Sequence, residues 1–330
     1  MRPPAVAPHH RPGGGFRNPW VDHAVPGFGS LLKWMLVHRT TRPRPKDPDP
    51  SVFARVRPAF VTPRATLSKL TVTWVGHSSL LIQLNGLNIL TDPMWSERAS
   101  PVRFAGPRRW VPPGIVFEDL PPLDVVVESH NHYDHLDSNT VRRLARAHPQ
   151  ASWIVPLGLA SFVRQRGAPA DAVAELDWWG EKKVGPVRIG ATPAQHFSSR
   201  GFGDRGDTLW CGFAFVGANG QRVYFAGDSG YHPEFGAIGE RYGPFDVALM
   251  PIGAYEPRWF MRYLHMNPEE AVAAFRALNA RLMVPIHWGT FKLTDEAMDE
   301  PPIRARAAWD AAGLPRSGYR QLAHGETLTL

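Results

Sequence analysis

Short hydrophobic runs separated by turn residues begin near residue 70 and continue to the end of the chain. Most of them are rich in β-branched and aromatic residues, which favour strands. The pattern predicts strands at 70–75, 79–84, 87–90, 124–128, 152–155, 187–192, 211–216, 222–226, 246–250, 281–286 and near Thr327. Asn-Gly pairs at 85–86 and 219–220 predict tight hairpins.

Helical segments lie between these strands. They are predicted at 138–147, around 159–166, at 268–278 and within 295–312. The third has a well-defined start, because Asn267 can cap it, Pro268 suits the first helical position and Glu270 can complete a capping box. Strands interspersed with helices indicate a layered α/β fold.

Residues 1–65 differ from the rest of the chain. They contain twelve of the 33 prolines and a run of three glycines at 13–15, so little regular structure is expected there. We therefore divide the chain into an N-terminal arm, residues 1–65, and a larger domain, residues 66–330. One segment of the arm could form a short helix with an apolar side and a basic end, either in a membrane interface or docked on the domain; it contains Phe28, Leu31, Leu32, Lys33, Trp34, Met35, Leu36, His38 and Arg39.

The arm also carries the positive charge of the chain. The formal net charge is +7, and the arm alone has eleven Lys and Arg against three Asp, so the domain is close to neutral. A basic arm on a neutral body suggests an anionic partner for the arm, either phospholipid or nucleic acid, rather than a protein that coats nucleic acid with its whole surface. The alternative is a solvated tail that only improves solubility.

Cysteine content and hydropathy limit the class of protein. The single cysteine, Cys211, excludes an internal disulfide and fits a reducing compartment. Because Cys211 lies in a predicted strand, we expect a buried core residue rather than a nucleophile. The chain has no apolar run of about 18 residues, so no membrane span is predicted, and no signal peptide is recognised.

The candidate chemistry is concentrated in six residues, HNHYDH at 130–135, that follow a predicted strand. His130 and His132 are two apart in an extended segment, so their side chains lean to the same side and can converge on one ion. Asp134 and His135 follow as the chain turns into the next helix, so they aim at a second point nearby. Imidazoles and a carboxylate suit zinc, and also manganese and iron.

Three further polar residues also follow predicted strand ends: His196, Asp228 and His287. Ligands placed in this way gather at one edge of a sheet assembly, on loops held by a rigid scaffold. The long irregular stretch at 93–122, rich in Pro, Arg and Trp, is a candidate wall of the substrate site.

Longer motifs add a family resemblance, which runs from Asn18 nearly to the C-terminus. The motifs are TWVGHSSLLI at 73–82, LTDPMWSERASP at 90–101, HNHYDHLD at 130–137, DWW at 177–179, GDSGY at 227–231, GPFDVALMPIGAYEPRWFM at 243–261 and PIHWGTF at 285–291. The sequence resembles the metallo-β-lactamase superfamily, and within it the family of N-acylphosphatidylethanolamine-hydrolysing phospholipases D.

The resemblance implies an αββα sandwich with two zinc ions at its edge. Seven residues of the expected types fill the metal positions of that family: His130, His132 and His196 for the first ion, Asp134, His135 and His287 for the second, and Asp228 as the bridge. His265 would lie by the reaction centre, and Asp134 would orient the nucleophile. The implied reaction is hydrolysis of a phosphodiester by a hydroxide between the ions, which releases N-acylethanolamine and phosphatidic acid from phospholipid.

The resemblance also implies partners and a location. Phospholipid is the expected substrate, the basic arm is expected to contact an anionic membrane surface, and no nucleic acid is expected. The family suggests a homodimer, and we expect a cytoplasmic protein that is peripheral on the inner face of the membrane. Aromatic residues in exposed loops, such as Trp95, Trp110 and Trp259, would help membrane contact; the alternative for each of them is a core or scaffold residue.

Two other functions stay open from the sequence. One is a lactonase resembling the ascorbate-6-phosphate lactonases, which share a related fold and metal motif. The other is a non-enzymatic protein that binds a membrane surface or nucleic acid through the arm, with purely structural metals. A complete ligand set with a bridging Asp228 argues against the second function, because structural zinc sites are normally closed and mononuclear.

Overall fold

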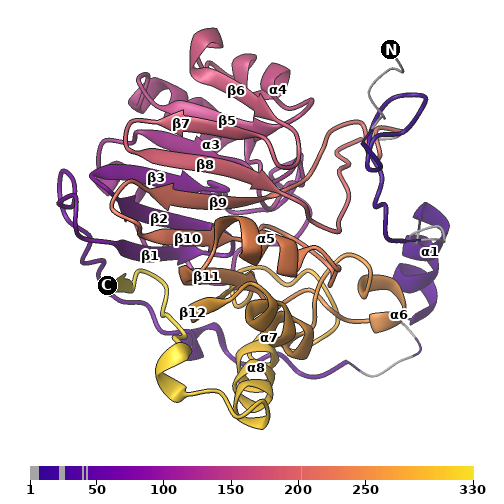
Figure 1. Ribbon diagram of the computed structural model, residues 1–330. Coiled ribbons are helices and arrows are strands. Elements are labelled where there is room, and N and C mark those ends of the chain that lie inside the picture. The colour runs from indigo at the N-terminus through magenta and orange to yellow at the C-terminus, as the bar shows by residue number, and fades with distance from the viewer. Residues whose placement is uncertain (1–6, 22–26, 39–40, 42–43, 202) are drawn as a thin grey trace.

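Two β-sheets pack face to face, and helices cover their outer sides, in the computed structural model of the chain (Figure 1). The structure describes residues 7–21, 27–38, 41, 44–201 and 203–330. The first sheet has the strand order β13 (Thr327–Thr329), β1 (Thr71–Gly76), β2 (Ser79–Leu84), β3 (Leu87–Thr91), β4 (Val125–Val127), β5 (Ser152–Pro156) and β6 (Val173–Leu176). The second has the order β12 (Ala280–Ile286), β11 (Phe245–Pro251), β10 (Arg222–Phe225), β9 (Gly212–Gly217), β8 (Val187–Thr192) and β7 (Glu181–Val184).

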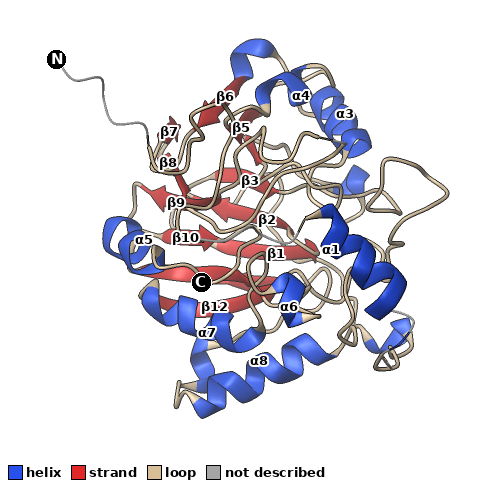
Figure 2. Cartoon of the chain, turned by 90° about the vertical axis from the view of Figure 1, so that its right-hand side faces the viewer, coloured by secondary structure: helices blue, strands red, loops and turns tan. Residues whose placement is uncertain are grey.

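Helices occupy both outer faces, so the predicted αββα sandwich is confirmed (Figures 1 and 2). The first sheet is covered by α3 (Ser138–Ala147) and α4 (Ala160–Arg164), and the second by α5 (Phe235–Tyr242), α7 (Pro268–Ala277) and α8 (Glu300–Ala311). At one edge of the sandwich lie α1 (Phe28–Lys33), the π-helix η1 (Trp34–His38) and α6 (Arg258–Met261). Single 3-10 turns occur at Pro50–Val52, Phe117–Asp119, Ala170–Ala172 and Arg316–Gly318.

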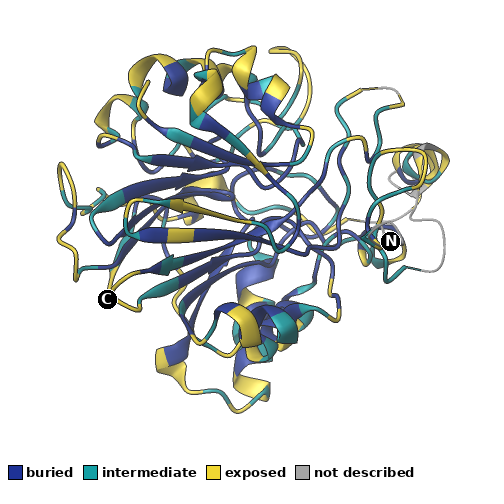
Figure 3. Cartoon of the chain, turned by 45° about the horizontal axis from the view of Figure 1, so that its top comes forward, coloured by how far each residue is buried: buried dark blue, intermediate teal, exposed yellow. Residues whose placement is uncertain are grey.

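The strands are apolar on both sides because each sheet is covered on both faces. In β4, Val125 and Val127 belong to the core between the sheets, whereas Val126 belongs to a second core with Val141 and Leu144 of α3. Figure 3 shows the central strands as almost entirely buried. Alternation along a strand therefore assigns neighbouring valines to different cores, although the sequence shows only a continuous apolar run.

Two local predictions are confirmed in detail. Asn85 and Gly86, which join β2 to β3, both have positive φ, 49° and 77°, as a tight hairpin requires. At the start of α7, the Asn267 side chain accepts a hydrogen bond from the Glu270 N–H, and the Glu270 side chain accepts one from the Asn267 N–H. The capping box is therefore formed.

Four helices and strands were not predicted: β6, β7, α5 and the four-residue α6. β6 has only four residues, and β7 begins with the exposed charged residues Glu181, Lys182 and Lys183, which hide a strand signal while protecting the edge of the sheet. α5 contains Gly236 and Gly239, which lower helix propensity. A Cβ atom at Gly239 would lie 2.7 Å from the Leu278 carbonyl oxygen, so this glycine allows α5 to pack closely against the end of α7.

Part of the arm docks on the domain through Trp34 of η1. Trp34 is only 4% exposed and packs against Phe260, Met261 and Leu264, and its indole N–H donates a hydrogen bond to Asp295. The opposite side of the same segment exposes Leu32, Met35, Leu36 and Val37. Docking on the domain is therefore observed, and an apolar side still faces outward.

Other sequence expectations about membrane contact have mixed outcomes. Trp95 and Trp110 are half-buried against the two cores, so the prediction that they are exposed is wrong, and only Trp259 fits it at 36% exposure.

Arg39, the basic end of the predicted helix, lies outside the described residues. The arm boundary at residue 65 stays a prediction. Within the described residues, no helix is long and apolar enough to cross a membrane.

Candidate metal centre

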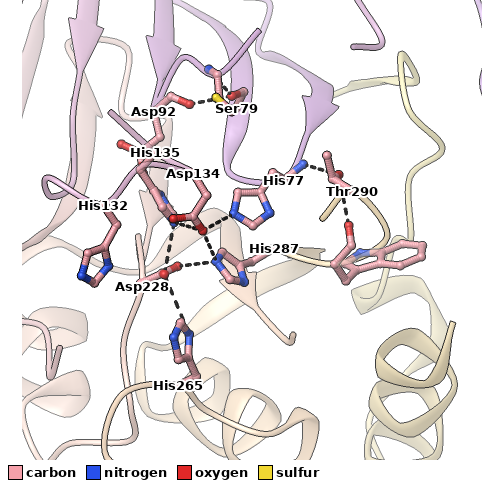
Figure 4. A network of polar contacts seen from close by, with 12 residues as sticks. His77, Ser79, Asp92, His132, Asp134, His135, Asp228, His265, His287 and Thr290 are labelled. Carbon is pink, nitrogen blue, oxygen red and sulfur yellow. Dashed lines mark hydrogen bonds and ion pairs between the residues drawn. The ribbon is translucent and has the colours of Figure 1, made fainter. Parts of the chain in front are cut away.

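The predicted ligand residues come together at one edge of the sandwich. Figure 4 shows His132, Asp134, His135, Asp228 and His287 among them. Each group follows a strand end: His130 follows β4, His196 follows β8, Asp228 follows β10 and His287 follows β12. β8 and β10 are both antiparallel to β9, and β10, β11 and β12 pair in parallel. The carboxyl ends of β8, β10 and β12 therefore share one edge, which is where their ligands meet those of β4.

His130, His132 and His196 form the first group. His132 Nδ1 lies 2.9 Å from His130 Nε2 and 3.1 Å from His196 Nε2. Three ring nitrogens this close together can surround one cation.

The second group contains Asp134, His135, His287 and an additional histidine, His77. The Asp134 Oδ2 atom lies 3.4 Å from His135 Nε2 and 3.6 Å from His287 Nε2. His77 Nε2 contacts the same oxygen at 2.8 Å and so fixes the orientation of the carboxylate. A second cation could lie among these atoms.

Asp228 lies between the two groups. Its Oδ2 atom is 3.1 Å from His135 Nε2 and 3.8 Å from His196 Nε2. Its Oδ1 atom is 3.1 Å from His287 Nε2. The carboxylate therefore faces ligands of both groups, which is what a bridging ligand must do.

Several buried atoms of the cluster make no hydrogen bond among the described residues: Nε2 of His135, Nε2 of His287 and Oδ1 of Asp228. They lie 3.1 Å from oppositely charged atoms but do not form hydrogen bonds with them, and buried polar atoms without hydrogen bonds are costly. These are the atoms that a divalent cation would use, and imidazole with carboxylate is a donor set that suits zinc. The cluster therefore fits a metal centre.

The carboxylates and histidines of the cluster shift one another's pKa values. Burial raises the pKa of Asp228, but the charges of His135 and His287 outweigh it and hold this pKa well below its usual range. Conversely, burial lowers the pKa of His287, but the carboxylates of Asp228 and Asp134 outweigh it and raise this pKa to about 9. The two carboxylates thus attract positive charge, which protonated histidines or metal cations can supply.

A second set of polar groups orients the ligand rings. His135 Nδ1 donates a hydrogen bond to Asp92 (2.6 Å), and His196 Nδ1 donates one to the Leu264 carbonyl (2.8 Å). Each bond keeps the proton on Nδ1 and leaves Nε2 directed into the cluster. Ser129 Oγ lies 2.8 Å from His130 Nδ1 and donates to Asp92, so Asp92 supports two ligand rings.

His77 and Asp92 were not among the site residues predicted from the sequence. His77 follows β1, and Asp92 follows β3, which pairs in parallel with β4. Their place after a strand could have identified both residues from the sequence. A polar residue at the carboxyl end of a neighbouring parallel strand reaches the same edge of the sheet as the predicted ligands.

Tight backbone turns direct the ligands inward. His77 and His287 have positive φ values of 56° and 60°, which are uncommon for residues with a side chain. Gly227 has φ 59°, and a Cβ atom there would lie 2.7 Å from the Ser129 Cβ. The motif GDSGY therefore needs glycine immediately before Asp228.

A pocket of about 410 Å³ opens onto the cluster. Its polar end is formed by His132, Asp134, Asp228 and His265. Most of the remaining wall is apolar and includes Leu31, Trp34, Phe197, Phe260, Met261, Leu264 and Leu293. His265 Nδ1 lies 3.8 Å from Asp228 Oδ2, and burial lowers the pKa of His265 well below its usual range.

The long loop at 93–122 does not line this pocket, so the prediction that it forms a wall is wrong for the described residues. Its polar groups instead bond within the loop and to neighbouring parts of the domain, such as Asp137 and Thr140. Arg109 donates hydrogen bonds to the carbonyls of Met94 and Ser96, and its guanidinium lies 4.7 Å from the centroid of the Phe291 ring. The pocket wall comes from segment 197–205, from α6 and from the arm.

Comparison with known proteins agrees with this geometry. Residues 87–288 match the beta-lactamase superfamily domain. The chain is 46% identical over 254 residues to N-acyl-phosphatidylethanolamine-hydrolyzing phospholipase D 1 of Caenorhabditis elegans, which covers 74% of this chain and 71% of that protein. It is 37% identical over 235 residues to the mitochondrial N-acyl-phosphatidylethanolamine-hydrolyzing phospholipase D of Saccharomyces cerevisiae, which covers 69% of this chain and 49% of that protein.

Solved structures share the fold. The metallo hydrolase Igni18 of Ignicoccus hospitalis has a TM-score of 0.60 at 25% identity, with 80% of this chain and 99% of that chain covered. Fold, ligand cluster and relatives agree on the class of protein: this chain is a metal-dependent hydrolase that belongs to the metallo-β-lactamase superfamily.

Proposed function

We propose that this hydrolase is a binuclear-zinc phosphodiesterase of phospholipase D type, which converts N-acylphosphatidylethanolamine-like phospholipids to N-acylethanolamine and phosphatidic acid. The observation that carries the proposal is a cluster of metal-binding residues at the polar end of an apolar pocket. The identity of 46% to the Caenorhabditis elegans phospholipase supports the same reaction.

The proposed ligands keep the division predicted from the sequence, with His130, His132 and His196 on one ion, Asp134, His135 and His287 on the other, and Asp228 between them. Two divalent cations bound there would lower the pKa of a water molecule and neutralise charge on the phosphodiester. The donor set favours zinc, and Mn²⁺ and Fe²⁺ are the alternatives.

The chain's own side chains prepare the substrate and the water. Asp134, held by His77, is proposed to accept a hydrogen bond from the attacking water and so orient it. His265 is proposed to contact the phosphate or the leaving oxygen from the pocket side. Because burial keeps the His265 ring neutral, one of its nitrogens can donate a hydrogen bond and the other can accept one.

The apolar pocket wall favours a lipid over a phosphorylated sugar lactone. Acyl chains would cover the pocket-facing sides of Leu31, Trp34 and Phe260, whereas a polar lactone would place polar groups against these apolar side chains. We therefore place phospholipid hydrolysis ahead of the lactonase alternative.

Access from a membrane surface is part of the proposal. The segment formed by α1 and η1 supplies Leu31 to the pocket and also exposes Leu32, Met35 and Leu36. Lys33 lies 6.0 Å from the centroid of the Trp259 ring and adds positive charge beside this apolar side. An apolar helix side with basic residues can bind an anionic interface. We propose a cytoplasmic, membrane-peripheral location, and a homodimer stays a prediction that light scattering would test.

The reaction is tested by mass spectrometry of products after zinc-loaded protein is incubated with N-acylphosphatidylethanolamine in mixed micelles. The proposal expects phosphatidic acid and N-acylethanolamine from the wild type and neither product from Asp228→Ala. If the wild type releases neither product but cleaves a generic phosphodiester, metal-dependent hydrolysis stands and the lipid substrate is wrong; phosphorylated lactones would be screened next.

Membrane binding is tested separately by co-sedimentation with vesicles that contain about one fifth anionic lipid. The wild type is expected to sediment, and the double variant Met35→Ser, Leu36→Ser is expected to stay in the supernatant. Equal sedimentation of both proteins would reject this part of the proposal.

A further inference from the structure

The segment at 196–207 links the metal centre to the pocket wall. It begins with His196 and also supplies Phe197, Ser199 and Arg205 to the pocket. On the domain side, it is fastened to the loop that carries the other ligands: the Ser199 N–H donates to the Asn131 side chain (2.8 Å), and Arg200 donates to the Leu136 carbonyl (2.8 Å). Its other side contacts residues 7–21 of the arm.

Asn18 of the arm makes a reciprocal pair of hydrogen bonds with the backbone of His196. The Asn18 Nδ2 atom donates to the His196 carbonyl (2.8 Å), and the His196 N–H donates to Asn18 Oδ1 (3.2 Å). After β8 ends at Thr192, the preceding residue Gln195 still bridges Gly230, and the Asn18 amide supplies the hydrogen bonds of the His196 backbone. The backbone of a proposed zinc ligand is therefore fixed from outside the domain.

The ring of the same histidine also depends on a contact with the arm. The His196 ring donates to the Leu264 carbonyl, and Leu264 packs against Trp34 of η1. With its backbone held by Asn18 and its ring by Leu264, the His196 Nε2 atom is directed at His132 Nδ1, 3.1 Å away.

Asn18 itself is held in place by anchors on both sides. His9 and His10 contact the two carboxylate oxygens of Asp177 at 2.6 Å and 2.8 Å. Both imidazoles thus contact the same carboxylate, and these contacts anchor the start of the arm to the domain. After Asn18, the Trp20 ring stacks on Trp178 with a centroid distance of 5.4 Å.

The glycine run of the arm forms a turn that completes this arrangement. Gly14 and Gly15 have φ values of 97° and 76°, and His10 forms a bridge with Phe16 across the turn. The Phe16 N–H donates to the Gly206 carbonyl at 2.6 Å. A Cβ atom on Gly15 would lie 2.5 Å from that carbonyl oxygen, so glycine is needed where the arm touches the segment.

We propose that Asn18 is a positioning residue for the metal centre, and that residues 7–21 are a structural part of the active site rather than a solvated tail. The proposal rests on the proposed binuclear site, because it assigns His196 as a ligand. Loss of the Asn18 bonds should let the His196 backbone move, which weakens binding of the ion that His196 holds while the second group keeps its own contacts.

The test compares three full-length variants by competition for zinc with a chromophoric chelator, together with kcat and KM. Asn18→Ala removes both bonds, and Asn18→Asp keeps the size but replaces the donor with a carboxylate oxygen that repels the His196 carbonyl. Both should bind one of the two ions about tenfold more weakly, with lower kcat and nearly unchanged KM. Asn219→Ala is the matched control and should bind zinc as wild type does, because it removes the side-chain bonds of an exposed asparagine before β10, at the end of that strand away from the ligands.

Zinc affinity is measured without substrate, so the result stands even if the lipid assignment fails. If folded Asn18→Ala binds zinc as tightly as wild type, the proposal is wrong. This holds even if the melting temperature of the variant is lower, because the arm would then stabilise the fold without positioning the metal ligand. If Asn18→Ala does not fold, as judged by near-ultraviolet circular dichroism, Asn18→Asp decides by the same comparison with Asn219→Ala. Absence of zinc binding in the wild type would instead reject the proposed metal centre itself.

Discussion

Asp92 is the carboxylate that holds the ring of His135 from behind. Its two oxygens also accept hydrogen bonds from the Ser129 N–H and hydroxyl, so they are fully used within the protein. A ligand ring is an effective donor to metal only when its other nitrogen has a fixed partner. Asp92 therefore contributes to metal binding without being placed to touch the metal.

We predict that Asp92→Asn weakens zinc binding by about 10- to 100-fold. The new amide group would face the N–H of His135 or of Ser129, so one hydrogen bond becomes a repulsion between two donors. Competition with a chromophoric chelator measures the change. Zinc affinity equal to wild type would show that the His135 ring does not need this partner.

His265 lies on the pocket side of the cluster rather than among the proposed ligands. We predict that His265→Gln lowers kcat by about 100-fold, as expected when a group that assists proton transfer is lost. Metal content, measured by mass spectrometry of the purified protein, should stay at the wild-type value. Loss of metal together with activity would instead make His265 a ligand.

At the scale of elements, the site depends on where strands stop. β8, β10 and β12 end in the same direction, and each is followed within a few residues by a ligand. Helices such as α7 then stabilise the sheet from outside and need not contact the metals.

The cap of α7 tests this separation of roles. Asn267→Ala removes the side-chain acceptor for the Glu270 N–H, and we predict a loss of about 1 kcal/mol in the free energy of unfolding. Urea unfolding measures the loss, and the zinc content of the folded variant should not change. A variant that folds with wild-type stability but binds less zinc would contradict this division between helix and site.

At the scale of the whole molecule, metal binding should contribute to stability because the ligands come from both halves of the chain. An ion at 1,000 times its Kd stabilises the folded state by about 4 kcal/mol. For a protein of this length, that is a change of about 6 °C in melting temperature. We predict that dialysis against a chelator lowers Tm by at least this amount and that added zinc restores it; a Tm unaffected by chelator would reject tight metal binding.

Buried neutral histidines should make the fold sensitive to acid. His232 is buried between Trp20 and Phe235, with ring centroids 4.9 Å and 4.0 Å away, and burial lowers its pKa to about 3. Between pH 6.5 and pH 3, the unfolded chain binds a proton at this position and the native protein does not. Stability is therefore lost as pH falls through this range, by about 2 kcal/mol at pH 5 for this histidine.

We predict that His232→Phe loses about 2 kcal/mol less unfolding free energy than wild type when the pH falls from 7 to 5. Phenylalanine keeps the stacked ring but cannot bind a proton. Urea unfolding of both proteins at the two pH values measures the difference. An equal loss in both proteins would mean that acid acts elsewhere.

Much of the fold was readable from the chain because its signals are local. The Asn85-Gly86 turn, the Asn267 cap and the apolar runs of the central strands each depend on residues close in sequence. The elements that escaped prediction, such as β7 with its exposed lysines, are decided by their place at a sheet edge. Local sequence patterns do not indicate whether a strand will lie at the edge or in the centre of a sheet.

The sequence by itself determined the class of the site. Histidines and aspartates after successive strand ends are enough to indicate metal chemistry, because strands of one direction deliver their ends to one edge. Only the tertiary structure decided which polar groups support the ligands: His77, Asp92 and Asn18 approach from segments far apart in the chain. It also decided that the arm, rather than the long loop at 93–122, forms part of the pocket wall. Distances between remote segments are set by packing, and the order of residues does not encode them locally.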